Sequence, residues 1–217
     1  MKYKLWYDSK VSVPTIYIHS FIGDGEDVWK AAHKIGCRPF NLVALFDFNG
    51  DENLTPWSAE NIWKGQPPFG GNAAEHLQQI CEVLIPEVES LLPAPSAYLA
   101  MVGYSLAGLF TLWTAFYTEV FKRIACVSAS FWYPDFTDFM HTHTLKPIDA
   151  VYFSLGDKES KTRHSLMKEV EERTQDVHGY ILSLGISTTF EMNSGNHFKD
   201  VEKRTARSIQ WLLEFED

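Results

Sequence analysis

The sequence has no hydrophobic run long enough to cross a membrane, and its N-terminus carries no recognisable signal peptide. Its apolar runs fall well short of the ~18 residues that mark a spanning helix, and the first ten residues lack the apolar core of a secretory signal. Cysteine is also scarce: three residues, none in a CxxC pair, argue against a disulfide framework and a thiolate zinc site. These absences predict a cytoplasmic protein with reduced thiols.

Basic residues are also fewer than acidic residues. The chain has 19 Lys and Arg against 28 Asp and Glu, a formal net charge of −9. Nucleic-acid-binding proteins present a basic patch, and anionic membranes attract basic segments, so we expect neither as a partner. There is no internal repeat and no low-complexity segment. Hydrophobic residues make up 45%, as in folded proteins generally, and a chain of 217 residues predicts a single domain over residues 1–217.

Short apolar runs alternate with helical segments along the whole chain. Nearly continuous apolar strands joined by helices are typical of a parallel sheet that is covered on both faces. The sequence therefore predicts an α/β fold with a mostly parallel central sheet and helices on both faces. The expected strands are residues 14–19, 41–47, 97–103, 124–129, 150–155 and a weaker 187–192, with a further edge strand at 3–7.

Three helices are expected from apolar residues at helical spacing, over residues 72–89, 162–179 and 201–215. Asn72 and the glutamate three residues later resemble a capping box, and Pro86 should kink or end the first helix.

In the last helix, the charged residues Lys203, Arg204 and Arg207 are expected to face solvent. Residues 50–71 have no convincing strand or helix. Loops of that length inside a compact domain tend to be lids or binding loops.

A serine stands at a predicted turn between a strand and a helix. The segment Gly103-Tyr-Ser105-Leu-Ala107-Gly108 directly follows the third apolar strand and opens a helical run. A nucleophilic serine at such a turn has a strained backbone, so the residues two before and two after it must be small. Gly103 and Ala107 meet this demand, and Gly108 would let the helix pack closely on the sheet. We therefore interpret Ser105 as a nucleophile; an N-cap serine at an ordinary turn is the alternative.

A serine hydroxyl needs an adjacent base to become a nucleophile. Serine hydrolases with the strand–turn–helix nucleophile have the chain order nucleophile, acid, histidine. His197 lies in a polar loop between the last strand and the last helix and is our candidate base. The other histidines after Ser105 fit less well, since they lie on charged helices or in an excursion from the sheet: His141, His143, His164 and His178.

The acid that orients the imidazole should follow the preceding strand. The loop there offers Asp157 and Glu159. We favour Glu159, because Asp157 is closer to the strand end and could cap the turn. Asp135 is a weaker third candidate, and an arrangement with serine and histidine alone also stays open.

An oxyanion formed on the substrate needs two N–H donors. One should be the amide of Leu106, the residue after the nucleophile, and the other should come from the loop after the first parallel strand. Phe21 is the expected second donor, with Ile22 next. His19, at the end of that strand, is expected to hydrogen-bond loop backbone rather than take part in chemistry.

Aromatic residues are abundant, at 14% with seven Trp, and several fall in the loops expected around Ser105. Ligand sites of α/β proteins gather at the carboxyl ends of the strands. We expect a substrate pocket walled by Trp57, Trp63, Trp132 and Tyr133, with aromatic packing under a long loop as the alternative.

The chain resembles the putative esterase branch of the α/β-hydrolase superfamily, which includes siderophore (enterochelin) esterases, esterase-D-like enzymes and feruloyl esterases. The resemblance covers about residues 14–215. It implies an α/β-hydrolase fold and serine hydrolase activity on an ester, without metal or organic cofactor. The segments that carry it are HSF at 19–21, NLTPW at 53–57, GYSLAG at 103–108, SASFWYPD at 128–135, SLGDKES at 154–160 and SGNHFKD at 194–200.

Two features depart from the family pattern. Ala107 replaces the usual second glycine of the nucleophile turn, and the N-terminus is short, so the first strands of the full fold are expected to be missing or shortened. We also expect no large cap domain.

The leading hypothesis is hydrolysis of a small-molecule carboxylic ester through an acyl-enzyme intermediate. Two alternatives remain: acyl transfer by the same three side chains, and a non-catalytic binding protein with the same fold. Homo-oligomerisation stays open.

Overall fold

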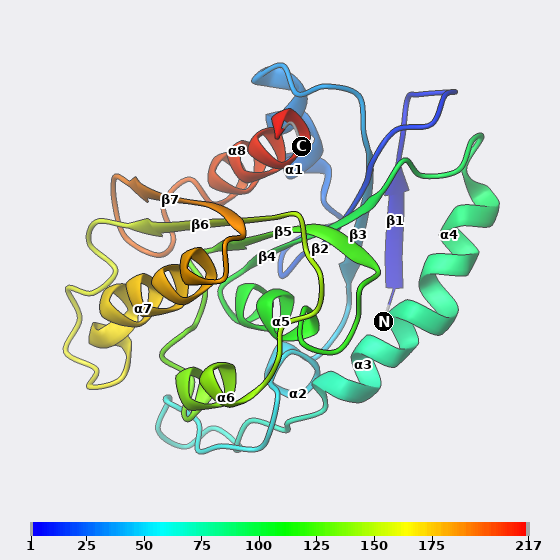
Figure 1. Cartoon of the computed structure of the whole chain (residues 1–217). Coiled ribbons are helices and arrows are strands. Elements are labelled where there is room, and N and C mark those ends of the chain that lie inside the picture. Colours follow the sequence, from blue (N-terminus) through cyan, green and yellow to red (C-terminus); the bar gives the residue numbers. More distant parts are fainter. Residues whose placement is uncertain (1, 216–217) are drawn as a thin grey trace.

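The computed structural model describes residues 2–215 and shows a seven-stranded sheet in the order β1-β3-β2-β4-β5-β6-β7 (Figure 1). Six strands run parallel, and only β1 pairs antiparallel, with β3. All seven predicted strands are therefore confirmed, the edge strand included. Their bounds are β1 Lys2–Trp6, β2 Thr15–His19, β3 Asn41–Phe46, β4 Leu99–Tyr104, β5 Phe121–Val127, β6 Ala150–Gly156 and β7 Ser187–Asn193.

The burial of the side chains agrees with the position of each strand in the sheet. The β2 and β6 strands are buried at every position, as expected for strands with helices on both sides. The β7 strand is only partly buried and lies at the edge of the sheet, where its polar residues can reach water.

Helices cover both faces of the sheet (Figure 1). On one face, α1 (Glu26–Lys34) and α8 (Val201–Glu214) pack against apolar residues of β2 to β6. The opposite face carries a second, larger core under α5 (Leu106–Thr114), α6 (Phe136–Thr142) and α7 (Val170–Ser183). The predicted architecture is thereby confirmed. Within the described chain, no cap domain is inserted between the strands, and no helix has the length and apolarity needed to cross a membrane.

The first predicted helix does not end at its proline. It consists of α3 (Ala73–Gln79), a π-helical turn (Ile80–Leu84) and α4 (Ile85–Leu91), so the helical path continues five residues past Pro86. In a regular α-helix the proline ring would collide with the carbonyl four residues earlier. The wider π turn lies directly before Pro86 in α4 and relieves this conflict.

Asn72 lies at the N-cap of α3, but the predicted capping box is wrong. Its side chain makes no capping hydrogen bond, because its amide donates to the carboxylate of Glu52 instead. This bond ties α3 to the loop that precedes it.

The 50–71 segment is more ordered than expected. It begins with a short helix, α2 (Gly50–Asn53), and contains a bridge between Ala59 and Phe69. The predicted helix over 162–179 starts later, since α7 is preceded by a 3₁₀ turn at Met167–Glu169.

Candidate active site

Ser105 lies at a strained turn between β4 and α5. Its φ of 59° and ψ of −124° are unfavourable for any residue with a Cβ. A Cβ on Gly103 would collide with the carbonyl oxygen of Ala107, and one on Gly108 would meet Ala129 at 2.7 Å. The turn therefore needs glycine at both positions, and the prediction that Gly108 lets the helix approach the sheet is confirmed.

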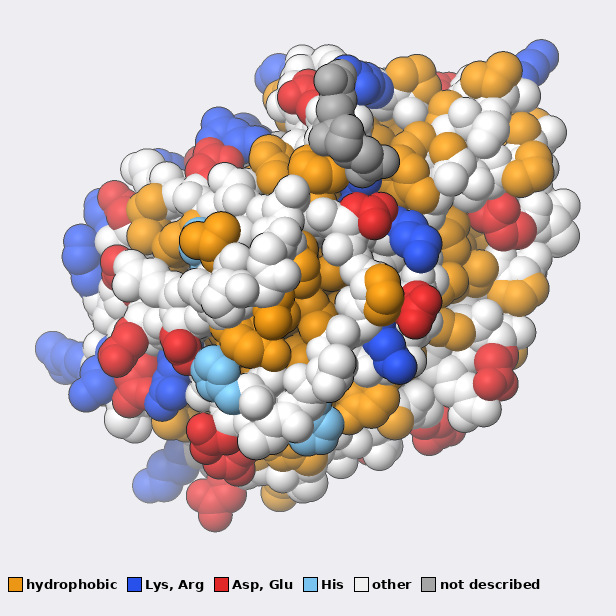
Figure 2. Space-filling view, viewed as in Figure 1, with side chains coloured by type: hydrophobic (Ala, Val, Ile, Leu, Met, Phe, Trp, Pro, Cys, Tyr) orange, Lys and Arg blue, Asp and Glu red, His pale blue; other side chains and the backbone are white. Residues whose placement is uncertain are grey.

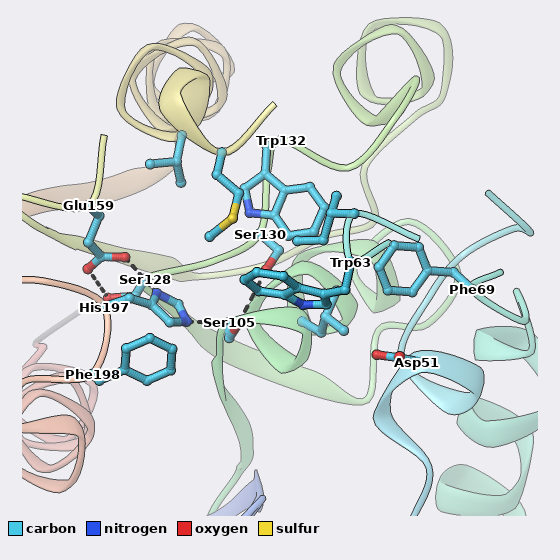
Figure 3. A pocket seen from close by; sticks show the side chains of 14 residues that line it. Asp51, Trp63, Phe69, Ser105, Ser128, Ser130, Trp132, Glu159, His197 and Phe198 are labelled. Carbon is cyan, nitrogen blue, oxygen red and sulfur yellow. Dashed lines mark hydrogen bonds and ion pairs between the residues drawn. The ribbon is translucent and has the colours of Figure 1, made fainter. Parts of the chain in front are cut away.

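The structure brings Ser105, His197 and Glu159 together from three different loops (Figure 3). His197 Nε2 lies 3.0 Å from Ser105 Oγ, and His197 Nδ1 lies 2.7 Å from Glu159 Oε2. His197 is in the β7–α8 loop and Glu159 in the loop after β6. The imidazole is 23% exposed and the carboxylate 3%. A proton can thus pass between the hydroxyl and the imidazole, while the carboxylate fixes the ring.

Asp157, the other acid considered, does not contact the imidazole. Its Oδ1 accepts a hydrogen bond of 2.7 Å from the Gly195 amide, and this bond lowers the pKa of Asp157. The aspartate thereby holds the loop that carries His197. Asp135 is the N-cap residue of α6 and is likewise not among the partners of His197.

The Glu159 carboxylate is buried but fully bonded. Its Oε1 accepts from Ser128 Oγ at 2.8 Å, from the Gly156 amide at 2.7 Å and from Arg204 Nη1 at 3.0 Å. Burial raises the pKa of Glu159, but the hydrogen bond and charge of His197, with the bonds from Ser128 and Gly156, outweigh it, so the pKa is lowered. The carboxylate is therefore ionised at neutral pH.

Arg204 was expected to face solvent, and this prediction is wrong. The residue is 3% exposed and points from α8 to Glu159. Its Nη2 also donates to the carbonyl oxygens of Ser194 and Asn196, at 3.2 and 3.1 Å. One guanidinium thus holds both the acid and the loop that carries the base. The sequence contains a signal for the burial, though not for these partners, because Arg204 precedes buried Ser208 and Leu212 at intervals of four residues.

Tyr104 and Ser130 also support the site, and the sequence reasoning missed both. Tyr104 donates its hydroxyl to the His197 carbonyl oxygen at 2.6 Å. Ser130 Oγ lies 3.4 Å from Ser105 Oγ, and its amide donates to the Ser105 carbonyl oxygen. Position alone could have suggested them, since Tyr104 adjoins the nucleophile and Ser130 follows β5.

None of the other candidate histidines contacts Ser105. His164 bonds the Ile62 carbonyl oxygen, His141 faces Asp176, His143 bonds the Phe139 carbonyl oxygen, and His178 packs on Phe153.

His19 does not bond loop backbone as predicted. Its Nε2 lies 2.9 Å from Nε2 of His76, and both rings are buried against Phe110. The pairing could not be read from the sequence because the two residues are 57 positions apart.

A pocket of about 210 Å³ opens at Ser105. Its walls are mainly apolar, and Figure 3 shows Trp63 and Trp132 above the serine. Phe198, 81% exposed, stands beside His197 at the rim. The lining consists of Asp51, Ile62, Trp63, Phe69, Ser105, Leu106, Ser128, Ser130, Trp132, Glu159, Met167, Val170, His197 and Phe198.

Two of the four aromatic residues predicted for the pocket lie behind it. Trp57 donates its indole N–H to the Pro134 carbonyl oxygen and packs on Tyr133. Tyr133 is 2% exposed, and its hydroxyl donates to the Trp57 carbonyl oxygen. Both are absent from the lining, because they join the 50–71 segment to the chain after β5. For them the packing alternative holds.

Two backbone amides were expected as oxyanion donors, those of Leu106 and Phe21. Leu106 lies at the N-terminus of α5 and lines the pocket. In the loop after β2, the Ser20 amide is used, since it donates to the Leu45 carbonyl oxygen. The Phe21 amide has no acceptor among the residues the structure describes. The Phe21 side chain faces away from the pocket, against Phe48, and lines a separate depression with Asp24.

Across residues 2–215, no three His, Cys, Asp or Glu side chains converge on a position that could hold a metal ion.

Comparison with known proteins places these features in a family. The family model described as "Putative esterase" matches residues 12–194. A curated relative, "Uncharacterized protein YbbA" of Bacillus subtilis (strain 168), is 26% identical over 181 residues, which are 79% of this chain and 72% of that protein.

Solved structures share the fold at low identity. The IroE-like serine hydrolase from Shewanella oneidensis superposes with a TM-score of 0.80 at 16% identity, over 99% of this chain and 77% of that one. The siderophore hydrolase EstA from Aspergillus nidulans gives 0.68 at 18%, over 94% and 83%. The enterobactin esterase FES from Shigella flexneri gives 0.69 at 12%, over 97% of this chain and 54% of that one. With most of its length matched by the family model, the chain belongs to the putative esterase family and has the α/β-hydrolase fold.

Proposed function

We propose that this protein is a serine esterase that hydrolyses a small-molecule carboxylic ester through an acyl-enzyme intermediate. The observation that carries the proposal is the chain of contacts Ser105 Oγ to His197 Nε2 and His197 Nδ1 to Glu159 Oε2, at 3.0 and 2.7 Å. The chain's place in an esterase family supports the reaction class.

In the acylation step, Ser105 attacks the ester carbonyl carbon while His197 Nε2 takes the hydroxyl proton. Glu159 accepts the Nδ1–H of His197, so the lone pair of Nε2 faces the serine, and its negative charge stabilises the imidazolium that forms. The amides of Leu106 and Phe21 are the proposed donors to the oxyanion. His197 then gives its proton to the leaving alcohol as the ester C–O bond breaks.

Deacylation repeats these steps with water. His197 removes a proton from the water, whose oxygen attacks the acyl carbon, and the proton then returns to Ser105 Oγ as the acid is released. The pocket is open at the rim formed by Phe198, so water can reach the acyl group once the alcohol has left.

The proposal is tested with a fluorophosphonate probe and a p-nitrophenyl ester. Wild-type protein should be labelled and should release nitrophenol. Ser105→Ala should lose labelling and at least ~10³-fold in kcat, as when a catalytic nucleophile is removed. Ser183→Ala is the matched control, because Ser183 is exposed at the end of α7, and it should behave as wild type.

Two outcomes would replace the proposal by an alternative. If the wild type binds an ester without labelling or turnover, the protein is a binding protein. If the acyl group passes only to an added alcohol or thiol and no free acid appears, the protein is an acyltransferase.

A further inference from the structure

The charge inside the pocket has one sign. Among the fourteen lining residues of the described chain, two are carboxylates and none is lysine or arginine. Glu159 is already neutralised by Arg204 and bonded to His197. Asp51 is different, because the only hydrogen-bond partner of its carboxylate among the described residues is the neutral amide of Asn61. Asp51 is therefore the pocket charge left to meet a ligand.

Asp51 is held in a fixed relation to the most exposed tryptophan of the pocket. Asn61 Nδ2 donates to Asp51 Oδ2 at 3.1 Å, and Asn61 Oδ1 accepts from the Trp63 amide at 3.0 Å. The Asp51 carbonyl oxygen also accepts from the Gly70 amide and from Thr55 Oγ1. One asparagine thus joins the carboxylate to the tryptophan, and the backbone beneath Asp51 is anchored twice.

Aromatic faces surround the space that Asp51 points into. Figure 3 shows the Asp51 carboxylate directed from α2 toward the serine side of the pocket, with Phe69 above it in this view and Trp63 on the side of Ser105. Trp63 is 57% exposed and lines the pocket, so its side chain is accessible to a ligand. A carboxylate near aromatic faces attracts a cationic group twice, by charge and by the cation–π interaction, and tryptophan gives the strongest such interaction.

We propose that the substrate of this site is an ester that carries a cationic ammonium group, bound between Asp51 and Trp63. This inference rests on the proposed esterase function and names the class of ester. An anionic ester would meet the unpaired carboxylate of Asp51 with no basic side chain in the lining to offset it. The net charge of −9 acts in the same direction, because it draws cations toward the protein.

The test compares pairs of esters that differ only in charge. One pair has the charge on the alcohol side: butyrylcholine and the analogue in which a tert-butyl group replaces the trimethylammonium group. The second pair makes the same replacement on the acyl side of p-nitrophenyl esters. We expect kcat/KM of the cationic member to exceed that of its neutral isostere by about tenfold in one pair, the value of one favourable cation contact.

Asp51→Asn keeps the size of the side chain and removes its charge, so it should bring that ratio close to one. Asp27→Asn is the matched control, because it removes the same charge from the exposed face of α1, and its ratio should equal that of the wild type.

A wild-type ratio of one or less in both pairs would overturn the inference, and so would a preference that survives in Asp51→Asn. Neither result touches the proposed function, which is judged by hydrolysis of the neutral esters with Ser105→Ala as control.

Discussion

Glu159 is an acid that could not remain charged at its position without help. Moving a carboxylate into a protein interior costs several kcal/mol unless a partner compensates, and only 3% of the Glu159 side chain is exposed. The positive charge of Arg204 and the hydrogen bonds from Ser128, Gly156 and His197 supply that compensation. In the proposed mechanism His197 therefore depends on a residue of α8, which bonds the carboxylate oxygen that the imidazole does not use.

Replacing Arg204 by methionine should impair stability and catalysis together. The buried Glu159 would lose its cationic partner, which typically costs 3–5 kcal/mol. The carboxylate would then be protonated more readily, so its pKa would rise and ester hydrolysis would begin to fail at a higher pH as the solution is acidified. The measurements are urea unfolding and the pH profile of kcat/KM.

Lys203→Met is the matched control for this prediction. Lys203 is exposed on the same helix, where it forms a surface ion pair with Asp200, so its removal should change stability little. Arg204→Lys should have a stability and a pH profile between those of Arg204→Met and Lys203→Met. It keeps the charge but has fewer donors for the backbone carbonyl oxygens. An Arg204→Met protein with a wild-type pH profile would show that the arginine is only structural.

At the level of elements, the tight turn between β4 and α5 determines the position of Ser105. The turn closes so tightly that the backbone of Ala107 and Gly108 occupies the place of a Cβ on Gly103. Such contacts cannot be relieved by a rotamer change, since the atoms met belong to the backbone.

Gly103→Ala should therefore destabilise the protein by ~1–3 kcal/mol or more and displace the serine. Gly179→Ala is the matched control: Gly179 lies in α7, and a Cβ there would meet nothing within 4 Å. That substitution should raise stability by up to ~1 kcal/mol, because alanine favours a helix over glycine. Thermal unfolding and ester hydrolysis of both variants test these two expectations. A Gly103→Ala protein as stable and as active as the wild type would contradict the first.

The same elements show what the sequence could predict. Strands such as β6 are continuous apolar runs, so their positions could be predicted from these runs alone. The serine turn was recognisable from its small residues. Chain order then pointed to His197 and to the Glu159 loop.

Long-range pairing could not be predicted in this way. Arg204 was expected in solvent because charged residues usually are, and its contacts with Glu159 and with the loop of His197 explain its burial. Trp57 and Tyr133 were expected in the pocket because their loops adjoin it, but side-chain direction decides such cases. The helix through Pro86 depends on a local π turn that hydrophobic periodicity does not reveal.

For the whole molecule, the contact of His19 and His76 makes folding sensitive to acid. His19 ends β2 and His76 belongs to α3, so their hydrogen bond joins the sheet to the helix that covers it. One imidazole must donate and the other must accept, and protonation of both rings would place two N–H donors and like charges 2.9 Å apart in the interior. Burial lowers the pKa of both rings, that of His76 to about 4.

The stability of the protein should therefore fall as the pH drops from 7 to 5. Both histidines stay neutral in the folded state but take up protons near pH 6.5 when unfolded, so their contribution is complete above that pH and is lost below it. For His76 alone this amounts to about 2 kcal/mol between pH 7 and pH 5. Urea unfolding at the two pH values measures it, and His76→Gln should remove that share of the decline. His143→Gln, at an exposed histidine after α6, should leave the decline unchanged, and a flat wild-type stability over this interval would contradict the prediction.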